Sequence, residues 1–259
     1  MAFGLVIIGG GNMGAALLGG LLASGRHEPA SIAVVEILPE RRRELEERFP
    51  GVTTADSVPD CESAVIAVKP PDAPAAAAAA AAAGAARLLS IAAGVKVATL
   101  EAAAGPGVAV VRAMPNTPAL VGQGASVITE SAAADDLAWA EEVLGAVGTV
   151  HRLAEHHLDA ITALTGSGPA YLFFVAEALI DAGVHVGLPL PLVTELTTQL
   201  FVGSSALLAD RGDAAALRRM VTSPGGTTAA GLAVLEERGV RAAFADAVRA
   251  AAARSAELG

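Results

Sequence analysis

The feature that most constrains this chain is a glycine pattern directly after a short apolar run. Gly9, Gly11 and Gly14 have the spacing G-x-G-x-x-G. The run LVIIG that leads into them predicts a buried strand, and AALLGGLLASG after them predicts a helix. Glycines at such a strand-to-helix turn allow a sharp bend, close approach of a pyrophosphate and tight packing of helix on strand. The chain is therefore expected to begin with the βαβ unit of a dinucleotide-binding fold.

Strands and helices alternate through the rest of the first half. The predicted strands lie at 31–36, 51–55, 63–70, 87–94, 108–118, 124–130 and 149–153. Between them come a charged helix, PERRRELEERF, a run of nine alanines and the helix DDLAWAEEVLGAVG. Strands separated by helices imply a mainly parallel sheet covered on both faces. We therefore expect an α/β Rossmann-like domain over residues 1–152.

Glu36, at the end of the second expected strand, bears on the choice of cofactor. A carboxylate at this position accepts hydrogen bonds from the adenosine ribose hydroxyls and repels a 2'-phosphate. Arg41, Arg42 and Arg43 follow on the next expected helix, where they either curl back and offset that repulsion or form a solvated face. The sequence thus favours NADH and leaves NADPH open.

From about residue 153 the strand pattern stops, and the sequence is helical to its end. Small residues are frequent in this half, among them Gly203, Ser204, Ser205 and Ala206. Small side chains permit close contacts between helices, and such helices often need a partner to bury their faces. We therefore expect an all-α domain over 153–259 that forms a homodimer, from which higher oligomers can be built.

The stretch VTSPGGTTAAGLAVLE joins a glycine turn to a helix in this second half. Gly225 and Gly226 let a ligand come close to the main chain. The helix that follows has free N–H groups and a partial positive charge at its start, which suits an anion such as a carboxylate. The hydroxyls of Ser223, Thr227 and Thr228 either contact that anion or only cap the helix.

Composition excludes several other classes of protein. The net charge of −10 argues against binding to nucleic acid or to an anionic membrane surface. Cys61 is the only cysteine, which fits a buried thiol in a reducing cytoplasm. The chain begins without a basic leader, and its most apolar stretch, 73–95, is mainly alanine, so no signal peptide and no transmembrane segment are expected. No Cys or His cluster at ligand spacing predicts a metal site.

Four blocks of sequence resemble the pyrroline-5-carboxylate reductase family. They are IIGGGNMGAALLGGL, AVKP, VRAMPNTPALVGQGA, and TALTGSGPAYLFF with VTSPGGTTAAGLAVLE, in family order over nearly the whole chain. The last pair is the most distinctive, whereas the first block alone would fit many dehydrogenases. The resemblance implies a Rossmann-like domain followed by a helical dimerisation domain. It also implies reduction of Δ1-pyrroline-5-carboxylate to L-proline by NADPH or NADH, the final step of proline synthesis.

The resemblance also assigns roles to matching positions. Gly9 and Glu36 are cofactor-binding candidates from the glycine pattern and the strand end. The resemblance adds Gly11, Asn12, Met13 and Gly14 at the pyrophosphate, Thr54 at the adenosine, and Ala67, Val68, Lys69, Pro70, Ala92, Ala93 and Asn116 on the nicotinamide side. Its substrate loop is Ser223, Gly225, Gly226, Thr227 and Thr228. Thr228 is expected to donate a hydrogen bond to the ring nitrogen and to orient the substrate, because a hydroxyl is a poor acid. Thr54 departs from the family, whose members often have Asn there.

Two other readings remain open at this point. A β-hydroxyacid-type dehydrogenase also joins a Rossmann domain to a helical one, but it would need a catalytic base, usually lysine, early in the helical half. No lysine follows Lys96 in this chain. The other reading is a nucleotide-sensing protein that kept the fold and lost the chemistry. Turnover of pyrroline-5-carboxylate separates both from the reductase.

Overall fold

The computed structural model describes residues 2–258, which form two compact units. The first unit runs to Ser167 and takes in the last stretch of the chain from Arg249, and the second is Gly168–Val248. The expected domain boundary at 152/153 marks where the strand pattern ends, but the chain stays packed on the α/β unit beyond it. Leu158 and Ala163 are fully buried there, which explains the difference.

The α/β unit is built on one eight-stranded sheet with the order β3-β2-β1-β4-β5-β6-β7-β8. All neighbouring strands are parallel except β6 and β7, which are antiparallel, so the expected mainly parallel sheet is confirmed. The strands are β1 Leu5–Ile8, β2 Ile32–Val35, β3 Thr53–Ala55, β4 Ser63–Ile66, β5 Arg87–Ser90, β6 Ala109–Met114, β7 Gly124–Thr129 and β8 Gly148–Leu153.

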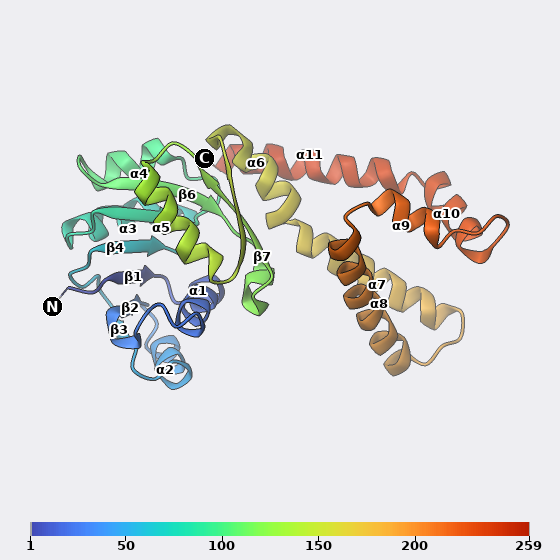
Figure 1. The fold of residues 1–259 in the computed structure, drawn as a ribbon, viewed down its shortest axis with the longest axis horizontal. Coiled ribbons are helices and arrows are strands. Elements are labelled where there is room, and N and C mark those ends of the chain that lie inside the picture. The colour runs from blue at the N-terminus through green and yellow to red at the C-terminus, as the bar shows by residue number, and fades with distance from the viewer. Residues whose placement is uncertain (1, 259) are drawn as a thin grey trace. The chain divides into compact units, whose positions relative to one another are not determined.

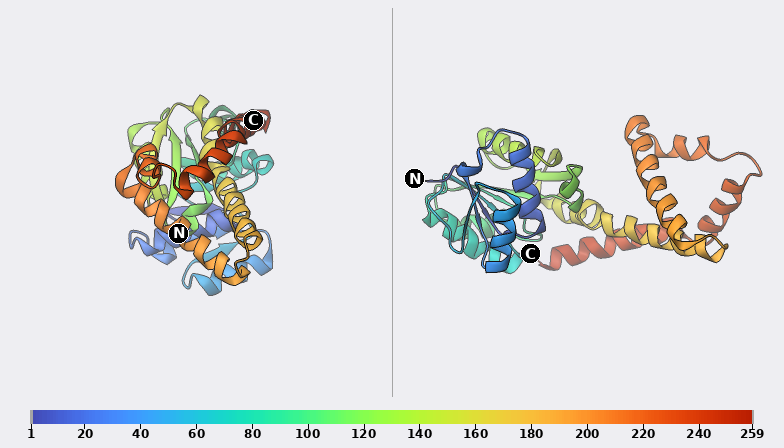
Figure 2. Two further views of the ribbon diagram at one scale, coloured as in Figure 1. Left: turned by 90° about the vertical axis from the view of Figure 1, so that its right-hand side faces the viewer. Right: turned by 90° about the horizontal axis from the view of Figure 1, so that it is seen from below.

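Helices cover both faces of this sheet (Figure 1 and Figure 2). They are α1 Asn12–Ala23, α2 Pro39–Arg48, α3 Ala73–Ala82, α4 Val97–Ala104, α5 Ala134–Gly145 and the short α6 Leu158–Ile161. Shorter 3-10 turns occur at Pro29–Ser31, Pro70–Asp72, Thr117–Val121 and Glu155–His157, and a π-turn at Thr162–Gly166. Two apolar cores result, one between the sheet and α1, α2 and α5, the other between the sheet and α3 and α4.

The strand order places a switch point at β1. Ile8, the last residue of β1, is paired with Val35 of β2 on one side and with Ile66 of β4 on the other. The connections from these two neighbours leave in opposite directions along the sheet, which opens a crevice at the carboxyl ends of the strands. This crevice is where the glycine turn lies.

A hydrogen bond beside the buried cation Arg112 holds the last helix of the described chain on the rest of the α/β unit. Arg112 of β6 is 4% exposed, and its Nη1 lies 3.0 Å from Oε1 of Glu155. The same oxygen accepts a hydrogen bond from the Val97 N–H at the start of α4. Nearby, the Ser255 hydroxyl donates to Oδ1 of Asp159 over 2.8 Å. The end of α11 (Val240–Leu258) therefore belongs to the α/β unit.

The second unit is entirely helical in the described residues. It contains α7 Gly168–His185, α8 Leu190–Arg211, α9 Ala214–Met220, α10 Thr227–Glu237 and the first part of α11. α7 and α8 pack closely, since a side chain at Gly183 would lie 2.7 Å from Val193 Cγ1. The expected change from alternating strands to helices is confirmed.

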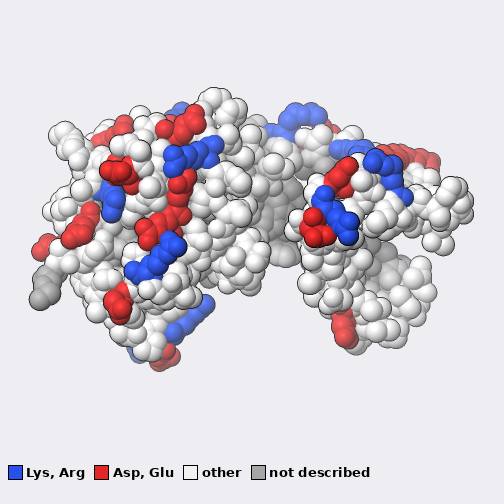
Figure 3. Space-filling view, viewed as in Figure 1, with Lys and Arg blue, Asp and Glu red and all other residues white. Residues whose placement is uncertain are grey.

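Much of the apolar surface of this unit is uncovered. Phe173, Phe174, Leu196 and Leu200 are all more than half exposed, and α7 and α8 show mostly uncharged surface in Figure 3. Two helical stretches, Glu155–His185 and Leu190–Arg211, are long and apolar enough to span a membrane by length and composition. The expectation of no transmembrane segment considered only residues 73–95, so for these two stretches it stays a prediction.

Candidate active site

A cleft of about 770 Å³ opens at the switch point of the sheet. Most of the predicted cofactor residues line it, namely Gly9, Gly11, Asn12, Met13, Glu36, Ala67, Val68, Lys69, Pro70, Ala92, Ala93 and Asn116. These residues come from the ends of β1, β2, β4, β5 and β6. The parallel sheet brings them together because it places all these strand ends at one edge.

The three glycines of the turn meet different surroundings. Gly9 has φ +111°, and a side chain there would lie 2.5 Å from the carbonyl oxygen of Ala67. A side chain at Gly14 would collide with the carbonyl oxygen of Gly9, so Gly14 allows α1 to pack on the turn. Gly11 has no heavy atom within 4 Å of the place a side chain would occupy. That open space beside the start of α1 is a cradle of the kind that holds a pyrophosphate.

Glu36 lines the cleft, and backbone N–H groups hold its carboxylate. Oε2 accepts a hydrogen bond from the Gly10 N–H over 3.1 Å, and Oε1 accepts one from the Leu38 N–H over 3.0 Å. Of the three consecutive arginines at the start of α2, one curls back to the glycine turn and one to the end of β2. Arg41 donates from Nε to the Gly10 carbonyl over 2.8 Å, and Arg42 donates from Nη1 to the Glu36 carbonyl over 2.7 Å.

The opposite side of the cleft comes from the ends of β4, β5 and β6. Asn116 is 9% exposed, and its Oδ1 accepts a hydrogen bond from the Ala125 N–H over 2.8 Å, so it also holds β7 in place. Sequence reasoning missed other lining residues, chiefly Met114 and Gly166. A side chain at Gly166 would lie 2.5 Å from the Met114 Cε, so this glycine keeps room for the methionine. The sequence Gly166-Ser167-Gly168 was the signal that could have indicated a close contact at this position.

One adenosine residue of the prediction lies elsewhere. Thr54, on the edge strand β3, is outside the set of residues that line the cleft. Its hydroxyl donates instead to the carboxylate of Glu46 on α2. The strand ends only one residue later, at Ala55, whose carbonyl accepts the Glu36 N–H. Thr54 thus joins β3 to α2 in this structure.

The predicted substrate loop belongs to the helical unit. Gly225 has φ +69°, a left-handed conformation that favours glycine, and Gly226 immediately precedes α10. No side chain caps the start of α10. The interpretation of Ser223, Thr227 and Thr228 as helix caps therefore has no support in this structure. The first N–H groups of α10 and these hydroxyls remain available to a ligand.

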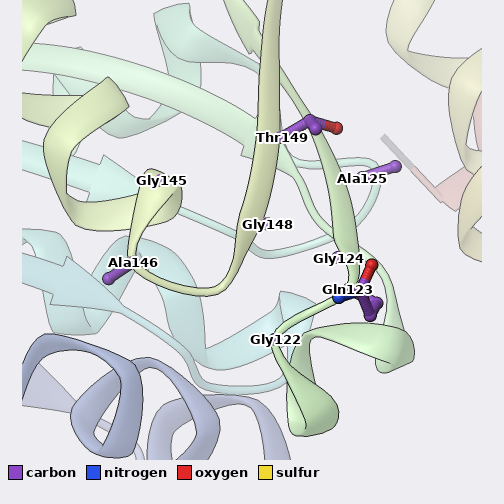
Figure 4. A pocket seen from close by; sticks show the side chains of 8 residues that line it. All are labelled: Gly122, Gln123, Gly124, Ala125, Gly145, Ala146, Gly148 and Thr149. Carbon is purple, nitrogen blue, oxygen red and sulfur yellow. The ribbon is translucent and has the colours of Figure 1, made fainter. Parts of the chain in front are cut away.

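A second cavity, of about 470 Å³, lies beside β7 and β8 and is drawn in Figure 4. Its lining is Gly122, Gln123, Gly124, Ala125, Gly145, Ala146, Gly148 and Thr149, with no charged side chain. The smaller volume and the lack of titratable groups make it a poor candidate for catalysis.

Cys61, as expected, is a buried free thiol. Burial raises the pKa of this thiol, and the negative charge of the neighbouring Asp60 adds to the rise.

Comparisons with known proteins agree with both halves of the prediction. A family model described as pyrroline-5-carboxylate reductase dimerisation matches residues 155–258, and one described as NADP oxidoreductase, coenzyme F420-dependent, matches 4–94. The pyrroline-5-carboxylate reductase of Mycobacterium leprae is 42% identical over 284 residues, covering 98% of this chain and 96% of the relative.

Two solved structures are also similar over their whole length. A pyrroline-5-carboxylate reductase from Coxiella burnetii has a TM-score of 0.89 and 33% identity, covering 100% of this chain and 99% of that one. Plasmodium falciparum pyrroline carboxylate reductase with NADP bound has a TM-score of 0.86 and 28% identity, covering 99% and 98%. On identity, coverage and fold, the chain belongs to the pyrroline-5-carboxylate reductase family.

Proposed function

We propose that this chain reduces the C=N bond of Δ1-pyrroline-5-carboxylate to give L-proline, the final step of proline biosynthesis, with NADPH or NADH as hydride donor. The observation that carries the proposal is the cleft at the switch point, where an unobstructed Gly11 lies at the start of α1. The family relationship supplies the substrate. The reduced nicotinamide would supply the hydride, and the protein's own residues supply binding and orientation.

In the cleft, Gly9, Gly11, Asn12 and Met13 would hold the pyrophosphate, with Gly14 packing α1 against the turn. The segment Ala67–Pro70, with Ala92, Ala93 and Asn116, would line the nicotinamide side. These are mostly apolar or backbone contacts, which exclude water from the reacting face. Such a lining orients a cofactor, and the cofactor itself carries out the chemistry.

The substrate loop would hold the carboxylate of the substrate. Ser223, Gly225, Gly226 and Thr227 surround the start of α10, where N–H groups and the helix dipole favour a negative charge. Thr228 is half-buried next to them and would donate a hydrogen bond to the ring nitrogen. Because an unperturbed hydroxyl is a poor acid, its role is to orient the imine, and the proton that the ring nitrogen gains comes from water.

The preferred cofactor depends on the residues around Glu36. Its carboxylate would favour the ribose hydroxyls of NADH and disfavour a 2'-phosphate. Arg42 lies beside it, donating to the Glu36 carbonyl, and reduces the negative potential there. We propose that both cofactors are used and that Glu36 biases the enzyme toward NADH, while Thr54 contributes little to the adenosine site.

The helical unit would form a homodimer, and dimers can build larger assemblies. The exposed apolar face of α7 and α8 is the surface available for this contact. A dimer contact also accounts for the two apolar helical stretches without a membrane. We propose a cytoplasmic enzyme that acts on a small molecule and binds neither nucleic acid nor membrane.

Steady-state reduction of pyrroline-5-carboxylate, with NADH and NADPH in parallel, tests the proposal. We expect turnover with both, and L-proline as the product. Binding of either cofactor without turnover would favour the nucleotide-sensing alternative. Turnover of a 3-hydroxy acid in its place would favour the dehydrogenase alternative, which already lacks its usual lysine.

A further inference from the structure

The geometry around Gly10 points to a further residue of the cofactor site. We propose that Arg41 is a positioning residue that holds the glycine turn in shape for the pyrophosphate, and so supports NADH and NADPH equally. This inference rests on the proposed use of the cleft as a cofactor site.

Gly10 is held by side chains on both of its backbone groups. Its N–H donates to Oε2 of Glu36 over 3.1 Å, and its carbonyl accepts from Nε of Arg41 over 2.8 Å. Its neighbours are fixed differently, because the Gly9 N–H donates to Val35 and the Gly11 carbonyl accepts from Ala15. Side chains from α2 and from the residue after β2 therefore both bind the backbone of the turn at Gly10.

The turn at Gly10 also packs closely against the side chains of α2 and Glu36. A side chain at Gly10 would lie 2.6 Å from Cδ1 of Leu45 and 3.2 Å from Oε2 of Glu36. Leu45 is 1% exposed in the core, so it cannot move aside freely. The turn is thus packed on α2, and the hydrogen bond from Arg41 fixes the direction of the Gly10 peptide relative to that helix.

Arg41 itself is held in place by a second contact. Its Nη1 donates to Oε2 of Glu44 over 2.7 Å, and its side chain is 27% exposed. An arginine just after an acidic strand end is often a ligand of the NADPH 2'-phosphate. Here two of its donor nitrogens are already engaged, one of them with the turn that both cofactors share. Its loss should therefore weaken both cofactors by the same factor.

The test compares Arg41→Ala with Arg43→Ala, since Arg43 is an exposed arginine on the same helix. Binding constants for NADH and NADPH are measured by nucleotide fluorescence on the full-length protein. We expect Arg41→Ala to raise both Kd values by about ten- to hundredfold, as for loss of one hydrogen bond from a charged donor. The ratio of the two Kd values should stay constant, and Arg43→Ala should leave both unchanged.

Two fragments separate positioning of the turn from binding of the 2'-phosphate. ADP-ribose has the pyrophosphate without a 2'-phosphate, and 2'-AMP has the 2'-phosphate without a pyrophosphate. Arg41→Ala should raise the Kd of ADP-ribose and leave the Kd of 2'-AMP unchanged. It should also raise the KM for either cofactor while kcat at saturation stays near that of the wild type, a split that general destabilisation would not produce.

Several results would overturn the inference. If Arg41→Ala weakens the binding of NADPH and not that of NADH, Arg41 is a ligand of the 2'-phosphate. If it changes the binding of neither cofactor, Arg41 is a surface residue without a role in the site. If Arg41→Ala fails to fold, Arg41→Gln, which can still donate to the Gly10 carbonyl, should bind both cofactors better than Arg41→Met, and equal binding by these two would contradict positioning. A wild type that binds neither cofactor would refute the proposed function itself, whereas the other outcomes leave that function standing.

Discussion

The two units of this chain treat apolar side chains in opposite ways. In the α/β unit, Leu17, Leu89 and Ile128 are fully buried between the sheet and its helices. In the helical unit, Phe174 is 70% exposed and Leu200 55% exposed, and α7 has no buried residue. The apolar cores of the first unit are formed within one chain. In the second unit, the apolar faces of α7 and α8 are exposed. A second copy of the chain is the simplest partner that would cover them.

The difference separates two tasks that a reductase must perform. The proposed cofactor cleft lies in the unit whose apolar core is formed within one chain, where strand ends hold their side chains in fixed positions. The proposed substrate loop lies in the unit whose apolar helix faces are exposed. Cofactor binding should therefore survive changes that abolish dimerisation, and substrate turnover should not.

The largest effect is expected from charging the exposed face of α8. Leu196 and Leu200 are four residues apart and share one face of the helix. Leu196→Glu combined with Leu200→Glu should prevent the proposed dimer, because burying two carboxylates against apolar side chains is unfavourable. Reductase activity should fall to background while NADH binding persists. Sedimentation velocity measures the assembly, and slow alkylation of Cys61 reports that the α/β unit remains folded.

The control for this variant is Val121→Glu. Val121 is 76% exposed but lies on the α/β unit, so a charge there should leave both assembly and turnover intact. If the α8 variant remains a fully active dimer, another surface makes the contact. If its Cys61 becomes reactive, the α/β unit depends on the dimer as well, and the contrast between the units fails.

A smaller loss is expected from Thr228→Ala, which removes a hydroxyl of the proposed substrate loop. The value of kcat/KM for pyrroline-5-carboxylate should fall by roughly ten- to thousandfold, as for a positioned polar group. The Kd of the cofactor should stay the same, because that site lies in the α/β unit. Thr222→Ala is the matched control, since the Thr222 hydroxyl is engaged with the Arg218 carbonyl. Wild-type turnover by Thr228→Ala would leave this residue without a catalytic role.

Two glycine variants sharpen the description of the α/β unit. Gly11→Ala should weaken both cofactors by about tenfold or more while thermal stability is unchanged, because the added methyl points into open space kept for the pyrophosphate. Gly14→Ala should lower the free energy of unfolding by about 1–3 kcal/mol through overpacking against Gly9. Denaturant unfolding and cofactor titration separate them. Equal loss of stability in both would mean that Gly11 is also a packing residue.

The smallest change is expected at Glu36. Glu36→Ser removes the carboxylate beside the ribose, so the ratio of kcat/KM for NADPH to that for NADH should rise by about three- to tenfold. Absolute affinity for both should also drop, since serine is too short to accept the Gly10 N–H. Parallel kinetics with the two cofactors give the ratio. A constant ratio would show that the carboxylate only supports the turn.

The sequence predicted those parts of the site that depend on local pattern. The glycine spacing and the strand ends located the cleft because a parallel sheet gathers strand ends at one edge. It did not reveal that Arg41 reaches back to Gly10, since PERRRELEERF reads equally as a solvated helix face. Gly166 and Met114 were missed for a similar reason, as their contact joins residues about fifty positions apart. Such contacts depend on tertiary packing.

The boundary between the units shows the same limit. The end of the strand pattern marked residue 153, and a family model begins close by, at 155. The packing continues to Ser167 because Leu158 and Ala163 are buried against the α/β core. The return of the chain end, with Ser255 bonded to Asp159, has no counterpart in any local pattern.

That return has a consequence for how the protein is made. Ser255 lies near the end of the chain, so a ribosome releases it after the whole helical unit has been synthesised. The strands and helices up to Ser167 can pair as they emerge, but their last helical segment is still missing. During that interval the apolar faces of α7 and α8 would be exposed, because the proposed dimer has not yet formed. We expect truncation after Val248 to leave a chain that aggregates on expression, even though it keeps every residue of the proposed cofactor and substrate sites.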